Sequence, residues 1–207
     1  RLLRLLAETQ IPKVFLDTSS LVAPDELNGD LLLMESRTSV RRITSHLLEQ
    51  GRTLPGFIGD IGYAQSNRER YEGFCQALTD AGKKVDSSLC LTTPLGIDTY
   101  REEIDTFLSS LSRMPDAFVC ASDYVACILM QLLEKRGLRV PEDVAVSGFD
   151  NNTEDLLAEH LTTVQVFNEE LGARLALQIL YRIKYPNTPH EVTYLGTNVL
   201  YRDSTGD

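Results

Sequence analysis

DAFVCASDYVACILMQLLEKRGLRVPEDVAVSGFD, residues 116–150, is the stretch of the sequence that decides the fold. Its first six residues form a short apolar run of the kind found in strands that are buried on both faces. Ser122 and Asp123 follow where a helix N-cap belongs, and Gly137 supplies the stop of that helix. DVAVSGF then forms a second apolar run. Two apolar strands joined by a helix predict a right-handed βαβ unit in a parallel sheet.

Both predicted strands of this unit end on polar side chains. Ser122 and Asp123 follow the first strand, and Asp150 ends the second. Ligands of open parallel sheets bind outside the carboxyl ends of the strands. We therefore expect a binding pocket at this edge of the sheet.

The rest of the chain continues the alternation of strands and helices. Further strands are expected over residues 11–17, 31–35, 54–60, 84–91, 161–167, 191–196 and 197–202, and helices over 36–50, 67–82, 98–111 and 168–185. This order predicts an α/β fold with parallel sheets. The opening residues RLLRLLAETQ have helical apolar spacing without a capping signal, which indicates a trimmed chain that begins inside a helix.

Composition narrows the possible functions. The formal charge of −10 disfavours DNA binding by this chain itself, because an acidic surface repels phosphate. The four cysteines lie far apart without a CxxC pair, so reduced thiols are expected rather than a disulfide framework or a metal site. We find neither a signal peptide nor an apolar run of membrane-spanning length, which favours a cytoplasmic protein without a membrane partner.

No enzyme motif is present. The sequence lacks a GxSxG elbow, a Walker loop and a GxGxxG after a strand, and its three histidines lack metal-ligand spacing. Aspartates at strand ends could form a carboxylate site, but caps and turns account for most of them. We expect no catalytic residue, no metal and no cofactor, although an enzyme of doubly wound fold stays an alternative.

A binding site is the stronger interpretation. Polar side chains near strand ends or the helix starts that follow them are Asp17, Ser66, Arg70, Ser122 and Asp150. Carboxylates accept hydrogen bonds from hydroxyl groups and a guanidinium donates a planar fork, so together they suit a sugar, polyol or nucleoside. Arg70 alone fits a solvated helix residue equally well.

Several blocks of the chain carry a family resemblance. The run PDAFVCASDYVACILMQLLEKRGLRVPEDVAVSGFDN resembles the effector domain of lactose-repressor/galactose-repressor (LacI/GalR) family transcriptional regulators. Further matches, in the family's order, are IPKVFLD, HLLEQGRTLPGFIGD, RERYEGFCQAL, LTTVQVFNEELGARLALQIL and VLYRDST. These blocks extend over essentially the whole chain.

The resemblance implies two α/β subdomains of periplasmic-binding-protein-like type I architecture, with crossover strands and a ligand cleft between them. The N-terminal effector subdomain, partly truncated, is expected over residues 1–35 and 168–190. The C-terminal effector subdomain is expected over residues 36–167 and 191–207. The family's DNA-binding headpiece is absent from this chain.

The same resemblance implies roles for the site residues. Arg70 looks like the family arginine that binds effector hydroxyls, with Asp150 and Asp17 as carboxylate partners and Ser66 on the pocket wall. Ser122 replaces the family's usual Asn, which leaves the class of ligand open.

One further position and the absence of Trp bear on the class of ligand, and one group of residues bears on the assembly. Val166 stands where a polar pocket residue is common in the family, and the chain has no Trp to stack against a sugar face. The family's dimer contact corresponds to Cys127, Met130, Gln131 and Ala158, for which packing against the sheet is the alternative.

The implied function is effector sensing and dimerisation in a DNA-binding transcriptional regulator, with repression as the expected activity. A small sugar or related polyol or nucleoside would alter operator affinity allosterically, through a homodimer and a headpiece outside this chain. A periplasmic sugar-binding protein of a transporter shares the fold and is the main alternative.

Overall fold

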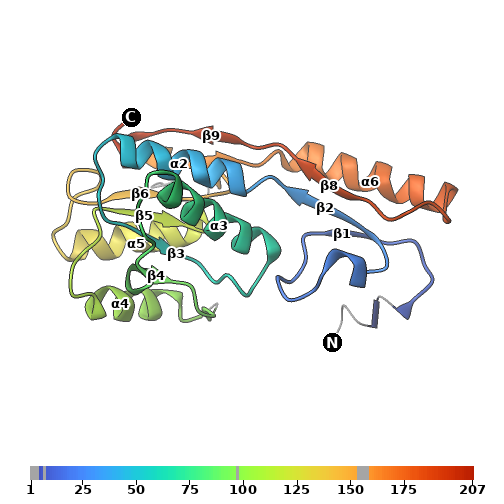
Figure 1. Ribbon diagram of the computed structural model, residues 1–207, viewed down its shortest axis with the longest axis horizontal. Coiled ribbons are helices and arrows are strands. Elements are labelled where there is room, and N and C mark those ends of the chain that lie inside the picture. Colours follow the sequence, from blue (N-terminus) through green and yellow to red (C-terminus); the bar gives the residue numbers. More distant parts are fainter. Residues whose placement is uncertain (1–4, 7, 97, 153–158) are drawn as a thin grey trace.

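Two parallel sheets lie at opposite ends of an elongated molecule (Figure 1). The computed structural model describes residues 5–6, 8–96, 98–152 and 159–207. The first lobe has the strand order β1-β2-β8, formed by β1 (Val14–Leu16), β2 (Asp30–Met34) and β8 (Val192–Leu195), with α6 (Asn168–Lys184) beside it. Both strand pairs in this sheet are parallel.

The second lobe is a four-stranded parallel sheet covered by helices on both faces. Its order is β4-β3-β5-β6, formed by β3 (Pro55–Ile58), β4 (Cys90–Leu91), β5 (Ala117–Cys120) and β6 (Ala145–Ser147). Its helices are α2 (Arg37–Glu49), α3 (Gln65–Asp80), α4 (Tyr100–Ser110) and α5 (Asp123–Lys135). The expected α/β architecture with parallel sheets is confirmed.

The βαβ unit expected over residues 116–150 is present as β5, α5 and β6. Every residue of β5 and β6 is buried, which agrees with the continuous apolar runs that predicted them. Ser122 caps α5 because its side chain accepts a hydrogen bond from the Val125 N–H, and Gly137 has the positive φ of a helix stop, 72°. β5 and β6 pair in parallel as neighbours.

A short antiparallel pair extends the second lobe. β7 (Thr163–Gln165) pairs with β9 (Asn198–Leu200), and isolated bridges join β7 to the end of β6. Short 3₁₀ turns complete the described elements: η1 (Pro24–Glu26), η2 (Ser87–Leu89) and η4 (Asp203–Thr205).

The two faces of the second sheet carry separate apolar clusters. On one face, α2 and α3 pack with residues such as Val40, Ile43 and Phe74. On the other, α4 and α5 pack with residues such as Ile104 and Leu129. Packing on both faces supports the carboxyl ends of β3, β5 and β6, and a binding site is held more precisely on supported strands than on loops.

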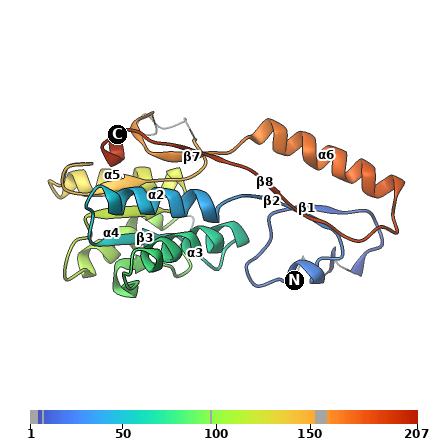
Figure 2. The ribbon, with the colours of Figure 1, turned by 45° about the horizontal axis from the view of Figure 1, so that its top comes forward.

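The chain passes between the lobes at three places: after β2, before α6, and between β8 and β9 (Figure 2). The first and third passages are hydrogen-bonded to each other. Glu35 N–H donates to the Leu195 carbonyl at 2.7 Å, and the Thr197 hydroxyl donates to the Glu35 carbonyl at 2.8 Å. These passages are the crossover segments that the resemblance implied.

One expected boundary is wrong. Residues 191–207 are expected in the second subdomain, but Val192–Leu195 pairs in parallel with β2 in the sheet of the first lobe. The sequence was misleading because the next strand, Asn198–Leu200, returns to the second lobe after only two residues. Helix α6 contacts β1, as its assignment to residues 168–190 of the first subdomain required.

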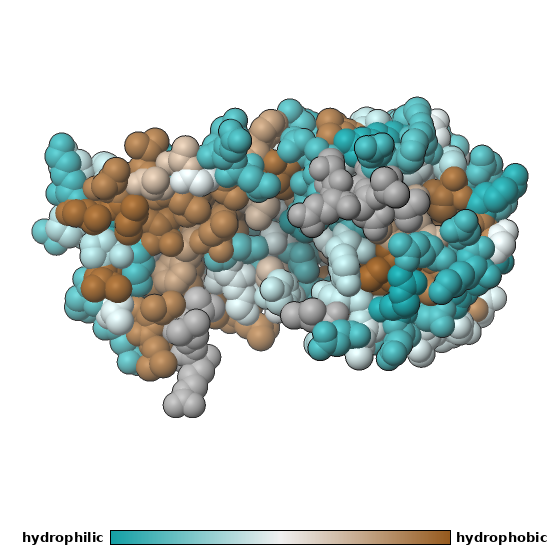
Figure 3. Space-filling model, turned by 180° about the vertical axis from the view of Figure 1, so that it is seen from behind, coloured by the Kyte–Doolittle hydropathy of each residue, from teal (hydrophilic) through white to brown (hydrophobic). Residues whose placement is uncertain are grey.

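Helix α6 turns polar side chains inward and apolar side chains outward. Arg182 donates to both carboxylate oxygens of Asp30, and Gln178 donates to the same carboxylate at 2.9 Å. The side chains of Leu177, Leu180 and Ile183 are about 60% exposed on this helix. Figure 3 shows the resulting apolar surface at the end of the molecule that holds the first lobe. No helix among the described residues is long and apolar enough to cross a membrane.

Candidate functional site

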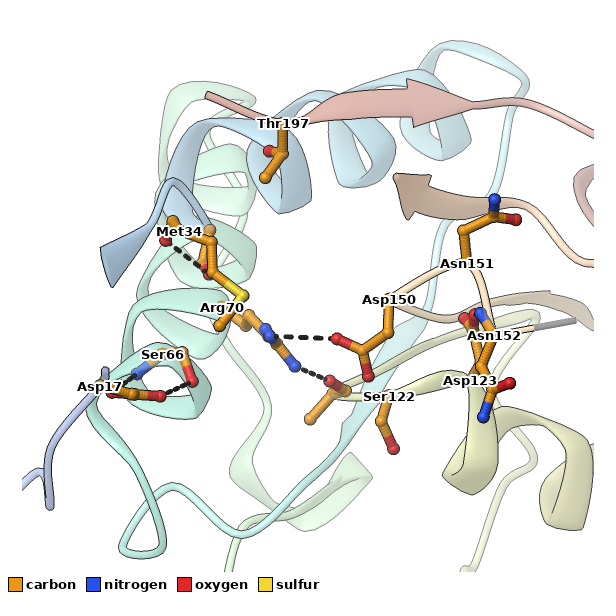
Figure 4. A network of polar contacts seen from close by, with 12 residues as sticks. Asp17, Met34, Ser66, Arg70, Ser122, Asp123, Asp150, Asn151, Asn152 and Thr197 are labelled. Atoms are coloured by element: carbon orange, nitrogen blue, oxygen red, sulfur yellow. Dashed lines mark hydrogen bonds and ion pairs between the residues drawn. The ribbon is translucent and has the colours of Figure 1, made fainter. Parts of the chain in front are cut away.

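The five residues expected to bind an effector lie where the two lobes face each other (Figure 4). Asp17 follows β1 of the first lobe. Ser66 and Arg70 lie on α3, and Ser122 and Asp150 follow β5 and β6, all in the second lobe. All five therefore occur at carboxyl ends of strands or on the helix that starts there, as expected for a parallel sheet.

Arg70 is the centre of this group. Arg70 is 4% exposed. Its guanidinium donates to the Ala121 carbonyl, and its Nη2 atom lies 3.5 Å from Asp150 Oδ1. The guanidinium carbon lies 3.6 Å from the centre of the Phe149 ring, a cation–π contact. Burial lowers the pKa of Arg70, and the surrounding carboxylates, Asp150 first, oppose that shift. The alternative of a solvated helix residue is therefore wrong.

The Nε atom of Arg70 is buried without a hydrogen-bond partner in the protein. A buried guanidinium nitrogen without an acceptor is unfavourable by about 1–3 kcal/mol, so such atoms are uncommon in native structures. Arg70 thus has a donor that no protein group among the described residues uses.

Asp150 combines a fixed backbone with an accessible carboxylate. Its φ of 112° is unusual for a residue with a side chain, and its N–H donates to the Val164 carbonyl at 3.1 Å. Burial raises the pKa of Asp150, and Arg70 opposes that shift. Its side chain is nevertheless 44% exposed. The Asp150 oxygens can therefore accept a ligand hydroxyl beside Arg70.

Asp17 and Ser66 bind each other across the two lobes. The Ser66 hydroxyl donates to Asp17 Oδ2 at 2.5 Å, and the Ser66 N–H donates to Oδ1 at 3.4 Å. Next to them, the Gln65 N–H donates to the Thr18 carbonyl at 2.7 Å. These contacts hold the loop after β1 against the start of α3. A ligand that uses Asp17 must replace or share the Ser66 contact.

Ser122 and Val166 depart from the family pattern, and the structure places both. Ser122 Oγ accepts from the Val125 N–H at 3.3 Å, so its acceptor is engaged in capping while its hydroxyl can still donate. Val166 is 6% exposed and packs in the apolar cluster with Phe149 and Val164. Ser122 therefore lacks the amide of the Asn in the family pattern, and Val166 offers no polar group to a ligand.

Sequence reasoning missed three polar groups around these residues. The sequence indicates Asp123 only as an acid at a strand end, whereas in the structure its carboxylate accepts hydrogen bonds from the Asn152 N–H and the Thr163 hydroxyl. Glu69 precedes Arg70 on α3 and is 3% exposed, although nothing in the sequence indicates that it is buried. Tyr194 donates to Glu69 at 2.7 Å from the first lobe, and no sequence signal pointed to this long-range contact.

The residues expected at a dimer contact have different environments. Cys127 is 3% exposed within the apolar cluster of α4 and α5, which favours the packing alternative for this residue. Met130 packs against the same cluster, and Gln131 accepts a hydrogen bond from Arg101. Ala158 lies outside the described residues. The dimer contact stays a prediction.

Metal ligands do not gather in the described part of the chain. No group of three or more His, Cys, Asp or Glu side chains there could hold a metal ion. His46 contacts Asp207 and Gln50, and His160 contacts Asp203, so both histidines form polar contacts with other side chains.

Comparison with known proteins places this geometry in a family. Residues 44–205 match the periplasmic binding protein-like domain. The HTH-type transcriptional regulator DegA of Bacillus subtilis (strain 168) is 31% identical over 170 residues, which cover 81% of this chain and 48% of that protein. The HTH-type transcriptional repressor PurR of Actinobacillus pleuropneumoniae serotype 3 (strain JL03) is 30% identical over 190 residues, 91% of this chain and 55% of that protein. The solved transcriptional regulator CelR–cellobiose complex matches with a TM-score of 0.81 at 27% identity, over 92% of this chain and 58% of that one.

The chain spans about half the length of the curated relatives it matches. Those relatives are named as transcriptional regulators, in agreement with the expectation that this chain is not an enzyme. The matched domain also confirms the periplasmic-binding-protein-like fold expected from the sequence. A solved regulator of the LacI family from Sanguibacter keddieii DSM 10542 matches at 27% identity with a TM-score of 0.79, over 95% of this chain and 72% of that one. The chain belongs to the periplasmic binding protein-like domain family and corresponds to the effector-binding domain of LacI-family transcriptional regulators.

Proposed function

We propose that this chain binds a small sugar, or a related polyol or nucleoside, between its lobes and thereby controls a transcriptional repressor. The observation that carries the proposal is the pairing of buried Arg70 with the accessible Asp150 carboxylate. A sugar hydroxyl can donate to Asp150 and accept from Arg70 at the same time. The CelR–cellobiose complex, a relative at 27% identity, supports a sugar as the first class to test.

Control of transcription follows from where the ligand binds. Asp17 belongs to the first lobe and Asp150 to the second, so a ligand that contacts both favours one relative position of the lobes. The three passages between the lobes are the segments that would change conformation. A ligand shifts this equilibrium only by the difference between its affinities for the two positions.

Operator binding requires groups that this acidic chain does not supply. We propose that a DNA-binding headpiece outside this chain makes that contact in a homodimer located in the cytoplasm. The PurR and DegA relatives, both named as HTH-type regulators, support this arrangement. Effector-dependent retardation of promoter DNA by the full-length regulator would test it, and retardation that no effector changes would contradict it.

Calorimetric titration tests the binding site directly. A panel of monosaccharides, cellobiose and nucleosides is titrated into the wild-type chain, and the tightest ligand into the Arg70→Ala and Asp150→Ala variants. Each variant is expected to bind more than tenfold more weakly, which is about 1.4 kcal/mol. Arg139→Ala and Asp143→Ala are matched controls, because they break an arginine–aspartate pair on the surface, away from the lobe interface. Unchanged affinity in both site variants would contradict the assignment.

A further inference from the structure

We infer that Asp123 is a positioning residue that holds Asp150 in the orientation needed to bind the effector. The inference rests on the proposed function, since it concerns the same site. Asp123 acts on the site through the segment Phe149–Asn152, to which its backbone and side chain are hydrogen-bonded.

Asp123 binds this segment on both sides of Asp150. Its backbone N–H donates to the Phe149 carbonyl at 2.8 Å, and its Oδ2 accepts from the Asn152 N–H at 2.8 Å. Its Oδ1 accepts from the Thr163 hydroxyl at 2.6 Å, and Thr163 Oγ1 accepts in turn from the Asn151 N–H at 3.2 Å. Asp150 therefore lies between the Phe149 carbonyl, which the Asp123 backbone binds, and residues 151–152, which the Asp123 carboxylate binds directly or through Thr163.

The backbone at this point needs such support. Asp150 and Asn151 both have positive φ, 112° and 51°, in consecutive residues that carry side chains. Positive φ costs on the order of 1 kcal/mol or more for such residues and persists only where the surrounding contacts fix it. The Asp123 network supplies contacts of that kind.

A plain helix-capping role does not explain Asp123. The preceding residue, Ser122, already accepts the hydrogen bond from the Val125 N–H that caps α5. The Asp123 carboxylate instead accepts from Asn152 and Thr163, which lie 29 and 40 residues further along the chain.

Gly148, which follows β6 and precedes Asp150 by two residues, leaves space for this carboxylate because it has no side chain. A Cβ atom at Gly148 would lie 2.2 Å from Asp123 Oδ1, which no side chain can occupy without a shift. Asp123 is 2% exposed, and burying a carboxylate is unfavourable unless hydrogen bonds compensate for its lost hydration. Because these hydrogen bonds include the segment that carries Asp150, they indicate a positioning role.

Asp123→Asn tests the inference with little change in shape. An amide replaces one carboxylate oxygen with an NH2 donor, so it cannot accept from Thr163 and Asn152 through two separate oxygens as the carboxylate does. We expect the Asp150 N–H, which donates to Val164, to exchange with solvent at least tenfold faster by NMR. Binding of the tightest ligand of the calorimetric panel should weaken about tenfold. Asp116→Asn is the matched control, because Asp116 accepts from backbone N–H groups at the opposite end of the sheet.

Thr163 provides a second test, which applies even where Asp123→Asn fails to fold. Thr163→Val removes the hydroxyl and should reproduce the faster exchange at Asp150, whereas Thr163→Ser keeps the hydroxyl and should restore the wild-type rate. Unchanged exchange at Asp150 in Asp123→Asn or in Thr163→Val would overturn the inference. The exchange measurement needs no ligand, so a wild-type chain that binds nothing in the panel refutes the proposed function separately.

Discussion

The hydroxyl of Tyr194 donates a hydrogen bond to Glu69 Oε1 at 2.7 Å and so joins strand β8 of the first lobe to helix α3 of the second. Glu69 is 3% exposed, and Gln65 Nε2 donates to the same oxygen at 3.1 Å. Burial, together with the hydrogen bond to Glu69, raises the pKa of Tyr194 to about 12. Tyr194 therefore stays a neutral donor at physiological pH and, with Asp17–Ser66, holds the lobes together beside Arg70.

Tyr194→Phe removes this hydroxyl and leaves the ring in place. We expect the free energy of unfolding to fall by about 1–2 kcal/mol, because buried Glu69 loses a donor. Urea denaturation of Tyr194→Phe, Glu69→Gln and the double variant measures the coupling between the two residues. Tyr181→Phe is the control, since its ring contact with Tyr185 is kept. A double variant whose loss equals the sum of the single losses would show that the contact contributes nothing.

Asp30→Asn should destabilise the first lobe strongly. Asp30 and Arg182 are 2% and 3% exposed, so the change leaves a buried guanidinium without its counter-charge. Such a loss costs about 3 kcal/mol or more. Burial raises the pKa of Asp30, but hydrogen bonds from Arg182, Gln178 and the Glu191 N–H outweigh it and leave the pKa lowered. The stabilisation is therefore present at neutral pH and is lost as the pH falls through the lowered pKa.

Thermal or urea denaturation at pH 7 measures this loss. Asp143→Asn is the control, because its pair with Arg139 lies at the surface and should matter much less. Equal losses in Asp30→Asn and Asp143→Asn would contradict the role of the buried pair.

The free energy of unfolding should depend on pH through the ionisation of Asp123. Burial raises the pKa of Asp123 to about 6, with Asp150 adding to the rise and Thr163, the Asn152 N–H and Arg202 opposing it. Because the folded chain holds this proton more tightly than the unfolded chain, this group favours folding more as the pH falls from 7 to 5. The difference in unfolding free energy between wild type and Asp123→Asn should grow by about 1 kcal/mol over that range. A difference independent of pH between 5 and 7 would contradict the raised pKa.

Arg70→Lys keeps the positive charge but loses the planar fork that stacks on Phe149. We expect the tightest ligand of the panel to bind about tenfold more weakly in calorimetry, while Arg139→Lys changes little. Wild-type affinity in Arg70→Lys would show that charge alone is sufficient at this position.

Most of the second lobe could be predicted from the sequence, although the strand expected over residues 84–91 is limited to Cys90–Leu91 and follows the 3₁₀ turn Ser87–Leu89. Continuous apolar runs and cap residues defined β5, α5 and β6, because local pattern and burial agree there. The first lobe was harder, since β8 joins its sheet from a position near the end of the chain. Only long-range pairing places Val192–Leu195, and no local signal carries that information.

The candidate site could also be predicted only in part from the sequence. Strand ends and the resemblance identified Arg70 and Asp150, which the structure brings to 3.5 Å. They could not reveal that Asp17 and Ser66 bind each other or that Glu69 has a partner in the other lobe. Those contacts depend on how the lobes meet, and sequence spacing does not encode that.

A crystal structure of the chain with its tightest sugar, polyol or nucleoside ligand tests the central claim most directly. The account predicts ligand hydroxyl groups within hydrogen-bond distance of the Arg70 guanidinium and the Asp150 carboxylate, between the two lobes. A ligand bound elsewhere, with neither Arg70 nor Asp150 in contact, would contradict it.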